Sequence, residues 1–81
     1  MNRIKSLRLK NKLTQTELAK YLNVAQNTIS YWEQGKYDID NESLTKLADL
    51  FRCSTDYLLG RETKNPVTLL EELDSMDEPN L

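Results

Sequence analysis

Two short amphipathic stretches, with only three residues between them, constrain the fold of this 81-residue chain more than any other feature. The first follows residues 14–17 (Thr-Gln-Thr-Glu), a capping box that predicts a helix start, and it extends to about Leu22. Asn23 then tolerates the left-handed backbone conformation of a helix end. The second stretch, Gln26–Gln34, is followed by Gly35, where a C-terminal cap belongs. The pattern predicts two helices joined by a very short turn.

The apolar positions of these stretches indicate that the two helices cross and pack against each other. They recur at helical spacing, and the turn between the helices adds one more apolar side chain. The positions are Leu18, Leu22, Val24, Ile29 and Trp32. Ala19 is small, which lets the second helix pass close to the first. Two helices that cross steeply through so short a turn have the form of a helix-turn-helix unit.

The polar residues that the second helix leaves outside favour DNA binding. They are Gln26, Asn27, Thr28, Ser30 and Tyr31, and none of them is charged. A helix that only faces solvent usually presents Glu and Lys, whereas side-chain amides and hydroxyls are donors and acceptors that read base edges in a major groove. The alternative interpretation is a helical hairpin that is packed for structure alone.

The rest of the first 61 residues adds three predicted helices and no strand. Residues 2–11 form the first of them, and Asp40 is the expected N-cap of the fourth helix in the chain. The inward residues of that fourth helix are Leu44, Leu47, Ala48 and Phe51. Ser54 is the expected cap of a short fifth helix that runs through Leu59. The sequence therefore predicts an all-α domain of five short helices over residues 1–61.

Composition excludes several classes of function. The chain has no histidine and a single cysteine, Cys53, so it lacks the residues for a zinc site or for a Cys–His or Ser–His catalytic pair. We therefore expect no metal, no cofactor and no enzymatic activity. The apolar runs are only two or three residues long, which is too short to span a membrane. A lone cysteine and the lack of a signal peptide predict a cytoplasmic protein.

The net charge of −2 combines two parts of opposite sign. Residues 1–61 hold ten Lys and Arg against seven Asp and Glu, whereas residues 62–81 hold one Lys against six acids. The first twelve residues contain no acid and five cations: Arg3, Lys5, Arg8, Lys10 and Lys12. On its own such a run is usually a solvated helix face, but a basic body is also what a DNA-binding domain needs.

Four segments resemble the phage Cro/repressor (XRE-type) helix-turn-helix family: residues 13–19, 24–36, 44–51 and 54–60. The resemblance covers about residues 2–61. It implies a five-helix fold like that of the lambda repressor, a role as a transcriptional repressor or activator, and binding as a homodimer to a pseudo-palindromic operator in double-stranded DNA. Two positions depart from the family pattern, because Asn23 stands where Gly is usual and Ile39 where many members have Pro.

The resemblance also implies roles for individual residues on DNA. The expected base-reading residues are Gln26, Asn27, Tyr31 and Thr28. The expected phosphate-binding residues are Gln15, Ser30, Lys36 and Arg8. The position of Thr28 and Ser30 is compatible with either kind of contact, and Gln15 would add the N-terminus of its own helix to a phosphate site.

Other residues are expected to support this surface. Arg8 and Glu33 correspond to a charged pair that links the first helix to the recognition helix in similar phage repressors. Trp32 is either a core residue or a stacking platform, and its spacing from Ile29 favours the core. Tyr21 and Tyr57 are expected to be packing residues.

Residues 62–81 read as an acidic tail or linker that contains, at most, a short amphipathic helix. Asn65 and Pro66 suit a helix start, and apolar residues follow at helical spacing. These are Leu69, Leu73 and Met76. Acids crowd the later turns, where the helix dipole disfavours them, so we expect this helix to be marginal alone. The tail would be a linker to a further part of a longer protein, a dimer contact or a segment that binds a protein partner.

The sequence is compatible with two classes of function. In the first, the chain is a transcriptional regulator, most simply a repressor, whose helix Gln26–Gln34 reads the major groove. In the second, it is a protein-interaction module such as an antitoxin, whose acidic tail covers a basic partner and whose DNA binding serves autoregulation. Operator binding by residues 1–61 alone would favour the first. Loss of a co-purifying partner on removal of the tail would favour the second.

Overall fold

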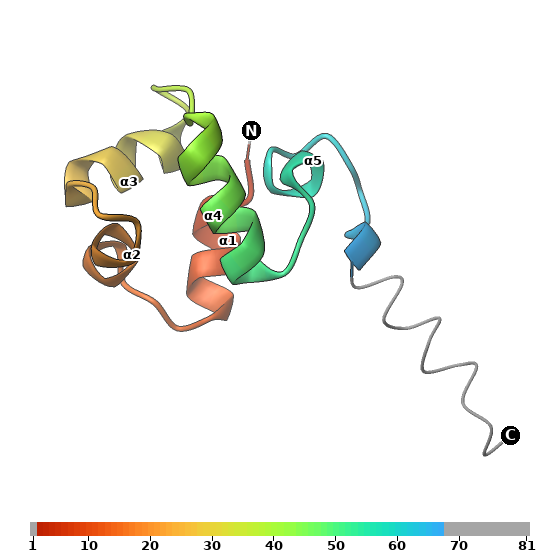
Figure 1. Ribbon diagram of the computed structural model, residues 1–81, viewed down its shortest axis with the longest axis horizontal. Helices are drawn as coiled ribbons and strands as arrows, with labels where there is room; N and C mark the ends of the chain where they lie inside the picture. Colours follow the sequence, from red (N-terminus) through yellow and green to blue (C-terminus); the bar gives the residue numbers. More distant parts are fainter. Residues whose placement is uncertain (1, 68–81) are drawn as a thin grey trace, which may run out of the picture.

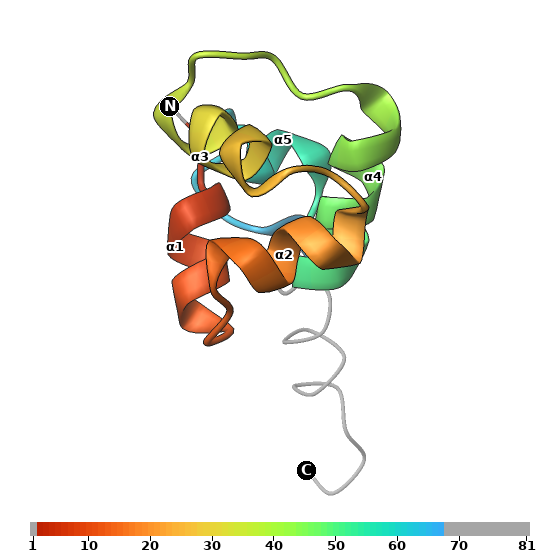
Figure 2. The ribbon, with the colours of Figure 1, turned by 90° about the vertical axis from the view of Figure 1, so that its left-hand side faces the viewer.

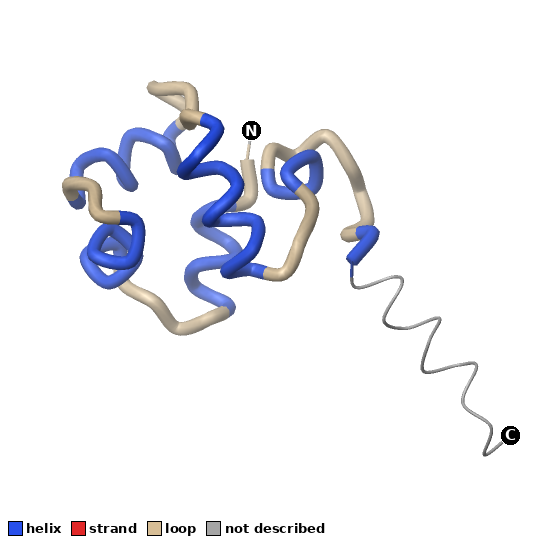
Figure 3. The backbone as a smooth tube through the Cα atoms, viewed as in Figure 1, coloured by secondary structure: helices blue, strands red, loops and turns tan. Residues whose placement is uncertain are grey.

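The computed structural model describes residues 2–67, which form five helices and no strand (Figures 1 and 3). The helices are α1 (Ile4–Lys10), α2 (Gln15–Leu22), α3 (Gln26–Gln34), α4 (Asn41–Phe51) and α5 (Thr55–Leu58). The predicted all-α architecture is therefore confirmed. Of the residues expected to form an amphipathic helix in the tail, the structure describes only those up to residue 67. The backbone is helical at residues 66–67, and Asn65 Oδ1 accepts from the Val67 N–H at 3.2 Å. The stripe of Leu69, Leu73 and Met76 lies outside the described residues.

Most predicted helix ends agree with the structure because residues beside them in sequence set them. Thr14 Oγ1 accepts from the Glu17 N–H at 3.0 Å, and the Thr14 N–H donates to Glu17 Oε1 at 2.9 Å, which completes the capping box. Asn23 ends α2 with φ 58°, and Gly35 ends α3 with φ 74°. The side chain of Asp40 caps α4, so Ile39 in place of proline does not disturb that helix start.

Two helices are shorter than predicted. We expected the first to cover residues 2–11, but it runs from Ile4 to Lys10, and Asn2 and Arg3 before it make tertiary contacts. The Arg3 N–H donates to the Leu58 carbonyl at 2.8 Å, and Asn2 Nδ2 donates to the Trp32 carbonyl at 2.7 Å. The fifth helix stops at Leu58, one residue before the predicted end. The start of α1 therefore lies where residues far away in sequence contact the chain, whereas the bonds at the end of α5 are local: the Gly60 N–H donates to the Tyr57 carbonyl at 3.0 Å and the Arg61 N–H to the Asp56 carbonyl at 2.8 Å.

One side chain from each helix is completely buried, so the core draws on all five elements. These residues are Ile4, Leu18, Ile29, Leu47 and Leu58. Trp32 is only 3% exposed, which confirms the core role over a stacking platform. Tyr57 packs partly buried against this core, but the same expectation for Tyr21 was wrong because Tyr21 is 56% exposed.

Helices α2 and α3 lie together at one side of the molecule. Figure 2 looks at that side and shows α3 above α2, with α1 and α4 flanking them and α5 behind. The loop between Gly35 and Asp40 arches over this group and leads into α4 (Figure 2). The start of the tail also touches the helical body, since Asn65 Nδ2 donates to the Arg52 carbonyl at 2.8 Å.

A buried ion pair fixes α3 against α1. Arg8 Nε donates to Glu33 Oε2 at 2.6 Å, and Arg8 Nη2 donates to Glu33 Oε1 at 3.3 Å. Arg8 Nη1 donates to the Leu13 carbonyl at 2.9 Å. The two side chains are only 8% and 4% exposed. Geometry of this two-pronged kind recovers much of the cost of removing both charges from water.

We predict that Glu33→Gln strongly destabilises the domain, because it leaves the Arg8 guanidinium buried without a negative partner. Removing one member of a buried pair typically costs about 3–5 kcal/mol. The matched control is Glu42→Gln, which makes the same chemical change in the exposed pair between Glu42 and Lys46. That change should cost less than about 1 kcal/mol. Urea unfolding measures both, and equal unfolding free energies for the two variants would contradict the prediction.

The cap of α4 makes stability depend on pH in a defined direction. The Ser43 N–H donates to Asp40 Oδ2 at 3.1 Å, and this bond holds the pKa of the Asp40 carboxyl below its ordinary value. A lowered pKa means that the cap stabilises the folded state when the pH is above the ordinary pKa of aspartate, and that this contribution is lost as the pH falls through the folded value.

We therefore predict that Asp40→Ala lowers the urea midpoint at neutral pH, and that its difference from the parent narrows as the carboxyl becomes protonated. Asp40→Asn is the matched control, because asparagine caps a helix as well as aspartate does but does not titrate. Its midpoint should stay close to the parent's at neutral pH. A constant gap between Asp40→Ala and the parent down to pH 2 would contradict the prediction.

Candidate nucleic-acid interface

Helix α3 divides cleanly into a buried face and an outward face. Ile29, Trp32 and the side chain of Glu33 are buried. The other face carries side chains that are exposed or half-buried, and every one of them is uncharged. They are Gln26, Asn27, Thr28, Ser30 and Tyr31. The packing of α3 on α2 therefore presents outward the same five residues that the sequence predicted.

A chain of hydrogen bonds runs from the buried ion pair to this outward face. Gln15 Nε2, at the start of α2, donates to Glu33 Oε1 at 3.0 Å. Gln15 Oε1 in turn accepts from Gln26 Nε2, at the start of α3. The order along the chain is thus Arg8, Glu33, Gln15 and Gln26. The chain of hydrogen bonds thus links α1, α2 and α3 and ends at Gln26 on the outer surface.

The charge of Glu33 sets the direction of every amide in this chain. An ionised carboxylate only accepts hydrogen bonds, so Gln15 must turn its amino group towards Glu33 and its carbonyl towards Gln26. Gln26 must then use one amino hydrogen on Gln15. Its remaining N–H and its carbonyl oxygen stay available to a ligand. An amide presents one donor beside one acceptor in this way, which is the pattern that adenine matches at N7 and N6.

The expected phosphate-binding residues differ in how far their side chains are exposed. Lys36 is exposed just after α3, with Nζ 5.7 Å from the centre of the Tyr31 ring. Ser30 is half-buried and its hydroxyl accepts from Gln34 Nε2 at 2.9 Å. Arg8 is different, since its guanidinium is buried and donates to Glu33 and to a backbone carbonyl. That burial argues against a phosphate contact for Arg8, whose guanidinium is already occupied by Glu33.

Tyr37 is a surface residue that the sequence analysis missed. It is 60% exposed, and its ring meets the ring of Tyr31 edge-on, with centroids 5.0 Å apart and an angle of 69° between the planes. The signal that could have found it is Gly35. A glycine cap turns the chain back along the helix it ends, which brings the next residues beside its last turn.

Within residues 2–67, no helix is long and apolar enough to cross a membrane, and no three His, Cys, Asp or Glu side chains are grouped so that they could hold a metal ion. In the same part of the chain, every buried side-chain nitrogen and oxygen has a hydrogen-bond partner.

Comparison with known proteins identifies the family. A helix-turn-helix family matches residues 4–58, which is more than half of the chain. The HTH-type transcriptional regulator ImmR of Bacillus subtilis is 41% identical over 73 residues, covering 86% of this chain and 58% of that protein. Repressor protein C2 of Salmonella phage P22 is 39% identical over 57 residues, covering 70% of this chain and 26% of that protein. The chain thus spans little more than half the length of the first relative and about a quarter of the second.

A solved structure agrees with this assignment. The crystal structure of a transcriptional regulator from Listeria innocua superposes with a TM-score of 0.68 at 31% sequence identity, covering 93% of this chain and 72% of that one. The five-helix arrangement is therefore shared with that regulator. Together with the family match, this confirms the resemblance drawn from the sequence: the chain belongs to the XRE-type helix-turn-helix family.

Proposed function

We propose that this domain is a sequence-specific transcriptional regulator, acting as a repressor, that reads the major groove of double-stranded DNA with α3. The observation that carries the proposal is the uncharged polar face of α3, on which the chain of hydrogen bonds from Glu33 through Gln15 orients Gln26. The relatives named as a transcriptional regulator and a phage repressor support the regulatory role. Binding requires no chemistry at this surface, so we assign it no catalytic residue. A regulator of this kind works where the DNA is, in the cytoplasm.

Gln26 and Asn27 are the principal base readers in this proposal. They stand at the N-terminal end of α3, the end that enters the major groove in helix-turn-helix proteins. An amide can donate to adenine N7 while accepting from its N6 amine, so adenine is the proposed partner of at least one of them. Tyr31 lies one turn further along and would meet a thymine methyl, and Thr28 stands between them. Phosphates would be held by Gln15, Ser30 and Lys36.

We predict that Gln26→Ala or Asn27→Ala each weakens operator binding by about 1–3 kcal/mol and relaxes preference at one or two base pairs, with little effect on non-specific DNA. Lys36→Ala is the comparison, because a phosphate contact carries no base identity. It should weaken binding to all sequences alike and reduce the salt slope by about one unit.

The measurement begins with selection of bound sequences from a random DNA pool, which identifies the operator. Each variant is then titrated against operator and scrambled DNA over a series of salt concentrations. Gln26→Ala should remain folded because Gln26 is exposed. Equal losses on both DNAs for Gln26→Ala and Asn27→Ala would show that α3 is not the reading helix.

We also propose that the domain binds as a two-fold dimer on a pseudo-palindromic operator. One helix of nine residues reaches too few base pairs for useful specificity, and a symmetric pair doubles the sequence that is read. We predict that footprinting finds two inverted half-sites whose centres lie about one helical turn, roughly 10 base pairs, apart. Full-affinity protection of a single half-site would contradict the dimer.

A further inference from the structure

The turn after α3 carries two side chains back to the outward face of that helix. Gly35 takes the left-handed conformation, its N–H donates to the Trp32 carbonyl at 3.0 Å, and the Lys36 N–H donates to the Tyr31 carbonyl at 2.9 Å. This pair of bonds is the Schellman arrangement, which reverses the chain direction within two residues. As a result Lys36 and Tyr37 lie beside Tyr31, although they are five and six positions away from it in sequence.

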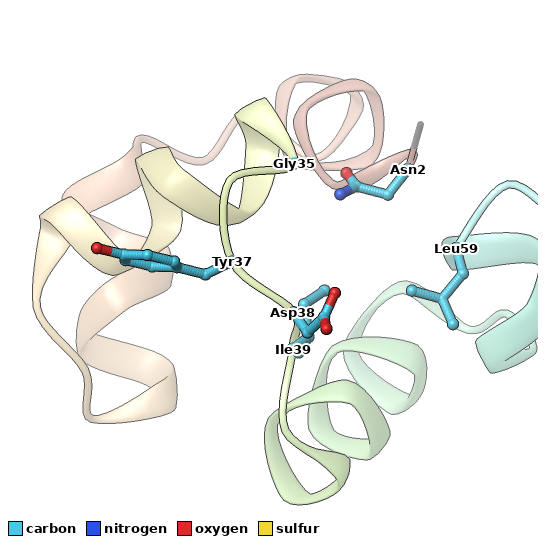
Figure 4. A pocket seen from close by; sticks show the side chains of 6 residues that line it. All are labelled: Asn2, Gly35, Tyr37, Asp38, Ile39 and Leu59. Carbon is cyan, nitrogen blue, oxygen red and sulfur yellow. The ribbon is translucent and has the colours of Figure 1, made fainter.

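The ring of Tyr37 adds little to the core. It is 60% exposed. Tyr37 is one of six residues that line a hollow of about 180 Å³, but in Figure 4 its ring points away from the side chains of Asp38, Ile39 and Leu59 in that lining. Its ring contact is the edge-on one with Tyr31, at 5.0 Å between centroids. The Lys36 ammonium approaches the same Tyr31 ring at 5.7 Å. An exposed aromatic in this position therefore acts on Tyr31 more than on the fold.

We propose that Tyr37 is a specificity-determining positioning residue, which holds the Tyr31 ring in the orientation that meets the 5-methyl group of a thymine. The inference rests on the proposed function of α3 and assigns a role in it to a residue outside that helix. Tyr37 acts through Tyr31 and need not touch a base itself.

The contact between the Tyr37 and Tyr31 rings is strong enough to affect DNA affinity. Fixing a free side chain on binding costs about two- to thirteenfold in affinity (0.5–1.5 kcal/mol). An edge-on aromatic pair contributes about the same amount beyond its buried area. Tyr37 can therefore offset the cost of ordering Tyr31 before DNA arrives. We expect Tyr37→Ala to weaken operator binding by about two- to thirteenfold.

A role of the Tyr37 ring and a role of its hydroxyl predict different effects of Tyr37→Phe on DNA binding. If the ring supports Tyr31, Tyr37→Phe keeps the contact and binds like the parent. If the hydroxyl instead held a phosphate, Tyr37→Phe would weaken binding to operator and scrambled DNA alike. This pair of variants separates a positioning role from an additional backbone contact.

The test replaces each operator thymine in turn by uracil, which removes only the 5-methyl group. One methyl-sized apolar contact is worth about fourfold in affinity (about 0.8 kcal/mol). We expect the parent and Tyr37→Phe to lose about fourfold at one thymine of each half-site. Tyr31→Ala and Tyr37→Ala should both bind the thymine and uracil operators equally at that position. Because Tyr37 is exposed, the urea midpoint of Tyr37→Ala should stay near that of the parent.

Retained fourfold discrimination in Tyr37→Ala would overturn the proposal, and so would equal losses of Tyr37→Phe on both DNAs. If the parent tolerates uracil at every position, the proposal also fails. The function proposed for α3 would survive that result as long as Gln26→Ala and Asn27→Ala still lose affinity for the operator alone. The experiment therefore distinguishes failure of the role proposed for Tyr37 from failure of the function proposed for α3.

Discussion

The charged pair between Arg8 and Glu33 determines both the position of α3 and the direction of the hydrogen bonds that lead to its outer face. Both side chains are buried, and they join α1 to α3, which are separated in sequence by α2. The pair sets the position of α3 on the body. Because a carboxylate can only accept, it also dictates which way Gln15 and then Gln26 turn their amides. A single ionised group in the interior thus defines donor and acceptor positions on the surface.

Packing and the proposed recognition of DNA use different residues of α3. Its core residues supply apolar volume, and its outward residues supply only neutral donors and acceptors. The neutrality of that face matters, because long-range charge gives affinity for any DNA whereas hydrogen bonds to base edges give preference for a sequence. The positive charge of the body comes from other segments, above all from α1 and its flanks. In the proposed function, base preference would come from the neutral face of α3, and the positive charge of other segments would add long-range attraction to any DNA.

The ends of α2 and α3 show how short backbone devices set the geometry of the surface. Asn23 and Gly35 both adopt positive φ values, 58° and 74°. The first lets α2 end within three residues of α3, and the second returns the chain to the side of Tyr31. A Cβ added at Gly35 would meet no atom within 4 Å, so space alone does not require glycine there. What favours glycine is the left-handed conformation, which other residues adopt at a cost.

Local features of this chain could be predicted from its sequence because neighbouring residues decide them. The capping box at Thr14, the caps at Asp40 and Ser54 and the apolar spacing of α2 and α3 all involve residues within four positions of each other. The identity of the outward residues of α3 follows from that spacing. So does the family, since its motifs lie in the same segments.

Other features, such as the burial and orientation of particular side chains, depend on residues far apart in the chain, and only the tertiary structure decided them. The burial of Arg8 and the direction of the Gln15 amide both depend on Glu33, which lies 25 and 18 residues away respectively. Tyr21 is exposed because none of the helices within residues 2–67 covers its side of α2, a fact that helical spacing cannot reveal. The contact between Tyr31 and Tyr37 is the local exception, because the turn at Gly35 brings together two residues that are only six positions apart. Sequence pattern tells which residues face outward, but the orientation of the amides on that face comes from long-range packing, since only the folded chain brings their partners together.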